Sequence, residues 1–206
     1  MKEGLGLQHQ TPEPTAPPRH LAITFDDGPD EDMTPKILST LRDYGVPATF
    51  FCIGQQVERF PDVLKSIHQA GHEIGNHTMT HPYLTKLTDA EIERELRECA
   101  AAIEKVVQVP IRYFRPPYGD IDDRVRRIAA SLHYEVVLWD VDSLDWSDIP
   151  GPAVAANVLP KLKPGAVILM HAGPFAKGTP DALPYVLEVA VAMGYDFVPL
   201  SKLQRA

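Results

Sequence analysis

Short apolar runs alternate with longer amphipathic stretches from about residue 20 to the end of the chain. The apolar runs predict strands near 20–25, 48–53, 72–75, 112–115, 135–140, 166–171 and 196–200. The stretches between them predict helices near 34–44, 60–70, 88–107, 121–132, 152–160 and 181–193. Alternating strands and helices are typical of a parallel α/β architecture, whose buried strands are apolar on both faces. We therefore expect a barrel or near-barrel of about seven strands rather than an open doubly wound sheet.

Two of the predicted helices carry clear end signals. Glu91 follows Thr88 by three residues and completes a capping box. Apolar residues then recur in steps of three and four at Ile92, Leu96, Cys99, Ile103 and Val106. A second helix is predicted to begin at Pro61 and to end at Ala70-Gly71, because glycine suits a helix C-cap.

The length of 206 residues suggests one main domain, which we place at 20–206. Residues 1–19 are rich in proline and polar side chains and are expected to form a linker or tail. The net charge of −8 and the pI near 5.4 argue against nucleic acid or an anionic membrane as a partner. No stretch approaches the ~18 apolar residues of a membrane helix, and no Gly-x-Gly-x-x-Gly turn supports a dinucleotide site.

The two cysteines, Cys52 and Cys99, have no spacing typical of a metal site. Cys52 lies in an apolar run and Cys99 on a predicted helix. Two free, mostly buried thiols are the preferred interpretation, and a disulfide between them is the alternative.

Ionisable side chains follow five of the predicted strands. They are Asp26 and Asp27, then His77 and His81, then Arg115, then Asp140, Asp142 and Asp145, and finally His171. In α/β barrels the active site lies at the carboxyl ends of the strands. These separated stretches are therefore expected to bring their side chains to one rim.

The adjacent carboxylates Asp26 and Asp27 favour a metal site. Two like charges at close range make ionisation of both carboxylates unfavourable, and a bound cation relieves this repulsion. The plainer interpretation is turn chemistry at Asp-Asp-Gly-Pro. His77 and His81, four residues apart, can point the same way on a helical turn and suit zinc. Their plainer interpretation is a pair of surface or capping histidines. With Asp27, the two histidines make the ligand count of a catalytic zinc site.

The remaining candidates have both structural and chemical interpretations. Arg115 precedes a Pro-Pro pair, and this rigid turn can aim backbone N–H groups at an oxyanion while Arg115 holds a carboxylate. A surface salt bridge is the alternative. His171 ends an apolar strand, where a core histidine is common. A partner among the three aspartates after residue 139 would raise its pKa and make it a proton donor near neutral pH.

Five ordered motifs resemble those of the polysaccharide deacetylases, the NodB-homology domains of carbohydrate esterase family four. They are Thr24-Phe-Asp-Asp-Gly-Pro29, His77-Thr-Met-Thr-His81, Arg115-Pro-Pro-Tyr-Gly119, Asp142-Ser-Leu-Asp-Trp146 and Leu169-Met-His171. The resemblance runs from about residue 20 to 203 and implies a distorted (β/α) barrel, often with seven strands.

The resemblance also implies a role for each matching residue. Asp27, His77 and His81 would bind one divalent metal ion, with zinc ahead of cobalt or nickel. Asp26 would be the general base that activates water at the metal, and Arg115 would orient Asp26.

The resemblance further implies that the backbone N–H of Tyr118 helps to stabilise the tetrahedral oxyanion. His171 would be the general acid that protonates the leaving amine, tuned by Asp145. Trp146 and Leu169 would wall the pocket for the acetyl methyl group. Ala172 stands where many relatives have an acidic residue, so the pocket rim is expected to differ.

The expected function is metal-dependent removal of N-acetyl groups from N-acetylglucosamine residues of peptidoglycan or chitin-like oligomers. The alternatives are an O-deacetylase on acetylated xylan, an inactive sugar-binding relative and a metal-dependent phosphatase, which the absence of a phosphate loop disfavours. Aromatic residues Tyr83, Tyr118, Trp146 and Phe175 are candidates to stack on sugar rings, with ordinary packing as the alternative for Tyr83 and Phe175.

Such polymers lie outside the cytoplasm, so we expect a secreted or cell-surface protein. The first ten residues hold no apolar signal core. The chain would then be the body of an exported protein without its leader, and a cytoplasmic protein is the alternative.

Overall fold

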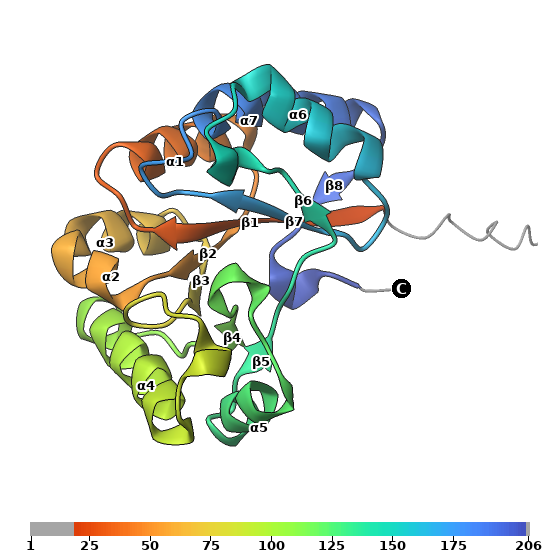
Figure 1. The fold of residues 1–206 in the computed structure, drawn as a ribbon. Helices are drawn as coiled ribbons and strands as arrows, with labels where there is room; N and C mark the ends of the chain where they lie inside the picture. The colour runs from red at the N-terminus through yellow and green to blue at the C-terminus, as the bar shows by residue number, and fades with distance from the viewer. Residues whose placement is uncertain (1–18, 205–206) are drawn as a thin grey trace, which may run out of the picture.

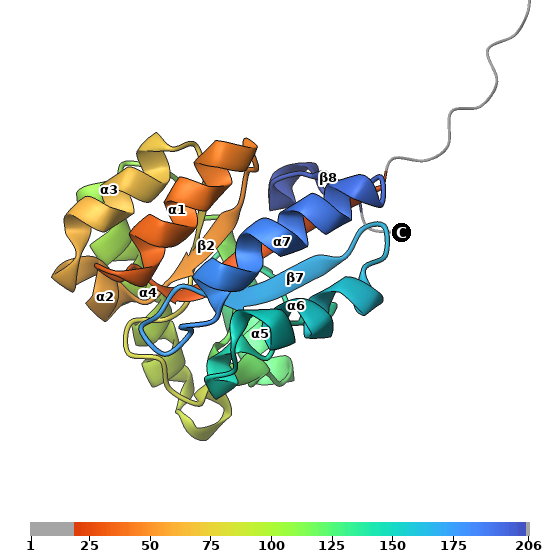
Figure 2. The same ribbon diagram turned by 90° about the horizontal axis from the view of Figure 1, so that it is seen from above.

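The strands form one curled parallel sheet, and the helices pack around its outer side (Figures 1 and 2). The computed structural model describes residues 19–204. The strands are β1 His20–Gly28, β2 Thr49–Cys52, β3 Glu73–Asn76, β4 Tyr113–Phe114, β5 Glu135–Val136, β6 Val141–Asp142, β7 Val167–His171 and β8 Asp196–Phe197. They follow the order β5-β4-β3-β2-β1-β7-β6, and β8 pairs with β1 beside this path. The predicted α/β class, a distorted barrel with about seven parallel strands, is confirmed.

The helices follow the predicted order with one addition. They are α1 Met33–Tyr44, α2 Gly54–Arg59, α3 Pro61–Gln69, α4 Asp89–Val106, α5 Asp123–Ser131, α6 Gly151–Val158 and α7 Thr179–Ala192. Short 3-10 turns lie at Leu84–Lys86, Pro117–Gly119, Asp145–Ser147, Leu159–Lys161 and Leu200–Lys202. The unpredicted α2 has no side-chain N-cap, so the usual start signal is missing.

The predicted end signals of α3 and α4 are confirmed. The Thr88 side chain accepts a hydrogen bond from the backbone N–H of Glu91, and the Glu91 carboxylate accepts one from the backbone N–H of Thr88. Helix α3 starts at Pro61, and Gly71 just beyond its end has a φ of +82°, a conformation that glycine adopts without strain.

The predicted strand over 135–140 starts where β5 starts, but its extent is wrong, because β5 ends at Val136 and the chain then crosses to the other edge of the sheet. β5 pairs with β4 at one edge, and β6 pairs with β7 at the other. In a flat sheet these edges would be roughly 29 Å apart, at about 4.8 Å per strand. The link over 137–140 can span at most roughly 18 Å. The sheet must therefore curl until its two edge strands, β5 and β6, come within reach of the link. This link, called the bridge (residues 137–140), takes the place of the β5–β6 pairing that would close the barrel.

Apolar packing holds the sheet and the helices together. The largest group of buried side chains lies between the sheet and helices α1, α3, α4, α6 and α7. A second group joins β4 to α4 and α5, and a third, which includes Phe51 and Val137, lies near the bridge. Cys52 and Cys99 are both buried and unbridged, as preferred from the sequence.

Two sequence predictions concern the chain outside this core. Residues 1–18 of the predicted linker lie outside the described residues. Within 19–204, no helix combines the length and the apolar character that crossing a bilayer requires.

Candidate active site

A cavity of about 890 Å³ opens at the carboxyl ends of the central strands. This volume lies within the range of small-molecule sites. Most of the predicted site residues line it, namely Asp26, Asp27, His77, His81, Tyr118, Trp146, Leu169 and His171. Arg115 and Asp145 lie behind this lining, fully buried. The single rim expected from the strand ends is therefore present.

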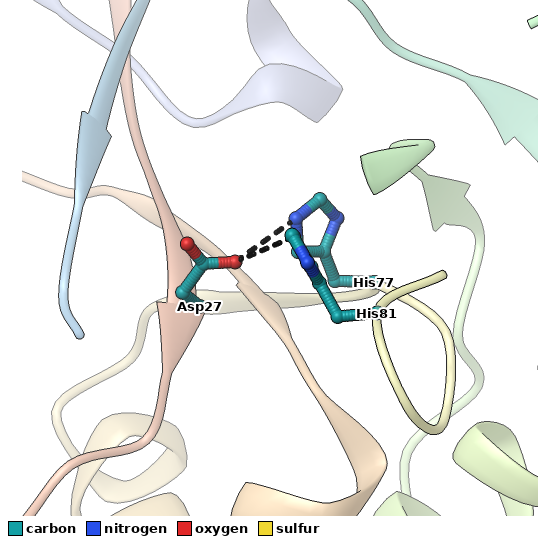
Figure 3. Close-up of side chains that lie close together, drawn as sticks. All are labelled: Asp27, His77 and His81. Carbon is teal, nitrogen blue, oxygen red and sulfur yellow. Dashed lines mark ion pairs between the residues drawn. The ribbon is translucent and has the colours of Figure 1, made fainter. Parts of the chain in front are cut away.

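Asp27, His77 and His81 meet at one point in the cavity (Figure 3). Asp27 Oδ1 lies 3.2 Å from His77 Nε2 and 3.1 Å from His81 Nε2. The histidines lie on the loop after β3 rather than on the helical turn considered from the sequence. Asp27 and His81 have φ values of +68° and +62°. Such left-handed backbone is uncommon outside glycine, and this local strain directs both side chains inward.

The donor atoms of this cluster fit a divalent cation. His77 Nδ1 lies 2.7 Å from the carbonyl oxygen of Arg115, which can only accept, so Nδ1 carries a proton. In the neutral ring Nε2 then carries a lone pair, which is directed at Asp27. Asp27 Oδ1 is buried and has no hydrogen-bond partner among the described residues. Two imidazoles and a carboxylate beside an open cavity match the ligand set of a catalytic zinc site.

The same cluster attracts positive charge. Burial opposes a charge on the His77 ring, but the carboxylates of Asp26 and Asp27 raise the pKa of His77 above its ordinary value. Burial likewise opposes ionisation of Asp27, yet His77 and His81 hold the pKa of Asp27 well below its usual range. The required positive charge can come from protons on the rings or from a cation between the three side chains.

Buried neighbours fasten the loop that carries the two histidines. Glu95 on α4 accepts hydrogen bonds from the backbone N–H and the hydroxyl of Thr80, at 2.8 and 2.7 Å. Thr78, with a φ of +68°, donates its N–H to Asn76 Oδ1 and accepts the N–H of His81. Glu95 carries no signal in the sequence, because an acidic residue in a helix is usually exposed and nothing marks this one as buried.

Asp26 is paired with Arg115 inside the barrel. Arg115 Nη1 donates to Asp26 Oδ1 and to Thr24 Oγ1, at 2.8 Å each. Arg115 Nε donates to the carbonyl of Val137 in the bridge at 3.1 Å, and Nη2 to that of Leu138 at 3.4 Å. Because Arg115 is fully buried, the surface salt bridge considered from the sequence is wrong. The bridge carbonyls help to hold the guanidinium in place.

His171 is paired with Asp145 at the end of β7. Asp145 Oδ1 lies 2.6 Å from His171 Nδ1, and Asp145 Oδ2 accepts the backbone N–H of His171 at 2.8 Å. Burial opposes a charge on the ring, but the hydrogen bond and the charge of Asp145 outweigh it. With smaller effects of Asp26 and Asp27, they raise the pKa of His171 to about 9. The ring is therefore a cation at neutral pH.

The other two aspartates of this region have local partners. Asp140 accepts the backbone N–H of Val167 and pairs with Lys163, and Asp142 accepts the backbone N–H of Leu144. Only Asp145 among the three therefore hydrogen-bonds to His171 in the described part of the chain.

Aromatic side chains form the mouth of the cavity. Tyr83 and Tyr118 stack with ring centroids 4.0 Å apart and planes at 12°. Trp146 is 52% exposed and Phe175 is 40% exposed, and Phe175 lies 5.7 Å from the His171 ring between centroids. All four rings are exposed, and Tyr83 and Phe175 also pack on neighbouring rings. Residues Gln55, Gln56 and Trp139 also line the cavity and carried no signal in the sequence.

The chain is similar to a group of known proteins. Residues 13–137 match the family model for polysaccharide deacetylase. A peptidoglycan-N-acetylglucosamine deacetylase of Bacillus cereus is 40% identical over 188 residues, which cover 90% of this chain and 88% of that protein. A chitooligosaccharide deacetylase of Sinorhizobium fredii is 39% identical over 152 residues, which cover 73% of this chain and 71% of that protein.

A solved structure has the same fold. It is a peptidoglycan N-acetylglucosamine deacetylase in complex with 4-naphthalen-1-yl-N-oxidanyl-benzamide. It is similar to this chain with a TM-score of 0.88 and 35% identity, over 92% of this chain and 90% of that chain.

Proposed function

The chain belongs to the polysaccharide deacetylase family, and we propose that it is a metal-dependent hydrolase acting on N-acetylglucosamine residues of peptidoglycan or chitin-like oligomers. The reaction would convert an N-acetyl group and water into acetate and a free amine. One observation carries the proposal. The Asp26 carboxylate and the His171 imidazole line one cavity together with the Asp27–His77–His81 cluster.

We infer that Asp27, His77 and His81 would hold one divalent cation, with zinc ahead of cobalt or nickel. When bound, such an ion supplies Lewis acidity to a carbonyl oxygen and lowers the pKa of a water molecule. The carbonyl of Arg115 keeps the proton of His77 on Nδ1, which leaves Nε2 free to act as a ligand.

Asp26 is the proposed general base. Arg115 binds Oδ1 of this carboxylate, and Oδ2 lies 3.7 Å from His77 Nε2 on the side of the cluster. Oδ2 is therefore the oxygen that would accept the proton of the attacking water. A positioned base of this kind typically contributes about 10² to 10⁴-fold in rate.

His171 is the proposed general acid. An amide nitrogen leaves as an amine only after it gains a proton, and the raised pKa of His171 keeps a proton on the ring at neutral pH. Because Nδ1 is bound to Asp145, Nε2 is the atom that would donate. The backbone N–H of Tyr118 would stabilise the oxyanion, a contribution typically worth ~3 kcal/mol per donor.

The mouth of the cavity fits a sugar chain. The exposed Tyr83–Tyr118 stack, Trp146 and Phe175 offer apolar ring faces to the apolar faces of pyranose rings. Leu169 is nearly buried and lines the same cavity as Trp146, where a small acetyl methyl group would contact it. A polymer substrate of this kind supports a secreted or cell-surface location.

Acetate release from N-acetylglucosamine oligomers tests the proposal. Purified protein is assayed as isolated, after chelation, and after zinc, cobalt or nickel is added back. Activity that is lost on chelation and restored by zinc is the expected result. Parallel assays use peptidoglycan and acetylated xylan. Faster turnover of the xylan ester would replace the N-deacetylase by an O-deacetylase, and oligomer binding without acetate release from any substrate would indicate an inactive relative.

A further inference from the structure

Asp145 is held by more than its histidine partner. Its Oδ2 atom accepts the backbone N–H of His171 and also the hydroxyl of Thr179, the first residue of α7. Its Oδ1 atom faces His171 Nδ1. Asp145 and Thr179 are both fully buried, so water cannot replace the Thr179 hydroxyl at the carboxylate. Thr179 belongs to none of the five sequence motifs.

Glycine packing sets the place of the Thr179 hydroxyl. A Cβ atom on Gly178 would lie 2.2 Å from the carbonyl oxygen of Ile149, and one on Gly151 would lie 2.8 Å from Asp181 Cβ. The first turns of α6 and α7 therefore approach each other as closely as backbone allows. The Thr179 N–H also donates to the carbonyl of Ala176 at 3.1 Å. The start of α7 is a rigid support for the hydroxyl.

We propose that Thr179 is a positioning residue for the proton-donating His171 and acts through Asp145. This inference rests on the proposed function of His171. A carboxylate can rotate about its Cβ–Cγ bond, and a rotation moves Oδ1 away from Nδ1. With two donors on Oδ2, the carboxylate keeps Oδ1 in line with the ring, so that Nε2 faces the cavity.

The charges around His171 come from two elements. Asp145 approaches from the Asp145–Ser147 turn, and Asp26 and Asp27 act from β1. The neighbouring Phe175 ring carries no charge. Within the described residues only Asp145 hydrogen-bonds to the His171 ring, so its orientation has the largest influence on the proton at Nδ1.

Two variants test this role in the whole chain. Thr179→Val keeps the shape of the side chain and removes the hydroxyl, and Thr179→Ser keeps the hydroxyl. The pKa of His171 is measured by NMR titration, with the signal assigned by its loss in His171→Asn. The alkaline limb of kcat/KM is measured in parallel. Thr40→Val, on the solvent side of α1, is the matched control.

The expected result for Thr179→Val is a pKa of His171 that is lower by about one unit or more. The alkaline limb moves down by the same amount, kcat falls about tenfold and KM is unchanged. Thr179→Ser and Thr40→Val are expected to match the wild-type protein. A folded Thr179→Val protein with an unchanged or raised pKa would overturn the inference. Because the titration needs no turnover, a wild-type chain that releases no acetate would refute the proposed function without deciding this result.

Discussion

Arg115 Nη1 lies 2.8 Å from Asp26 Oδ1, and both side chains are almost completely shielded from solvent. The guanidinium also donates to two carbonyls of the bridge that closes the sheet. The bridge, where the backbone departs from a regular barrel, therefore helps to hold the proposed base Asp26 in place through Arg115. A buried pair of this kind is costly to break from either side, because the remaining charge stays buried without its opposite charge.

Asp26→Asn is expected to separate catalysis from stability. The amide cannot accept a proton, so kcat should fall about 10² to 10⁴-fold, while zinc affinity stays within a few-fold. The amide oxygen can still accept from Arg115, so the stability loss should be smaller than for Arg115→Leu, which we expect to cost about 3–5 kcal/mol. Acetate release, zinc titration and urea unfolding measure the three effects. Near-normal turnover in Asp26→Asn would show that another group is the base.

His77→Ala is expected to abolish tight zinc binding. It removes one of three proposed ligands and the ring that hydrogen-bonds to the carbonyl of Arg115. Isothermal titration calorimetry of the chelated protein with zinc measures the change. His68→Ala, an exposed histidine on α3, is the control and should bind zinc like the wild-type chain. Equal zinc affinity in the His68 and His77 variants would place the metal elsewhere.

Glu95→Gln should weaken metal binding without touching a ligand. Glu95 holds Thr80 through two hydrogen bonds, one to each carboxylate oxygen, and the glutamine amide keeps only one of these two acceptor atoms. Supporting groups of this kind typically contribute about 10- to 100-fold to metal affinity. Glu98→Gln, at an exposed position on the same helix, is the matched control. If both variants bound zinc equally well, Glu95 would have only a packing role.

Stability should depend on pH through His171. The pKa of His171 is about 9, against an ordinary value of 6.5, so the folded state holds the proton more tightly than the unfolded chain. The stabilisation is complete below about pH 6.5 and is lost as the pH rises through about 9, by up to about 3 kcal/mol. Urea unfolding of wild-type and Asp145→Asn protein at pH 6, 8 and 10 measures the difference. A wild-type advantage that did not shrink between pH 6 and pH 10 would contradict this assignment.

The sequence by itself determined the elements and the chemistry at their ends. Apolar runs and caps are local signals, so β1, β7 and the start of α4 at Thr88 could be read directly. Because the carboxyl ends of parallel strands meet at one rim, residues as distant as Asp26 and His171 could be placed in one site before any coordinates.

Only the tertiary structure decided how these side chains meet. The division of 135–140 between two sheet edges depends on the curl of the whole sheet, and with it the burial of Arg115. Left-handed backbone at Asp27 and His81 sets the direction of two side chains of the proposed metal site. Glu95 and Thr179, the proposed supports, lie on helices that follow their partners by 15 and 34 residues, and no local pattern encodes these contacts. Long-range packing in three dimensions selected these partners.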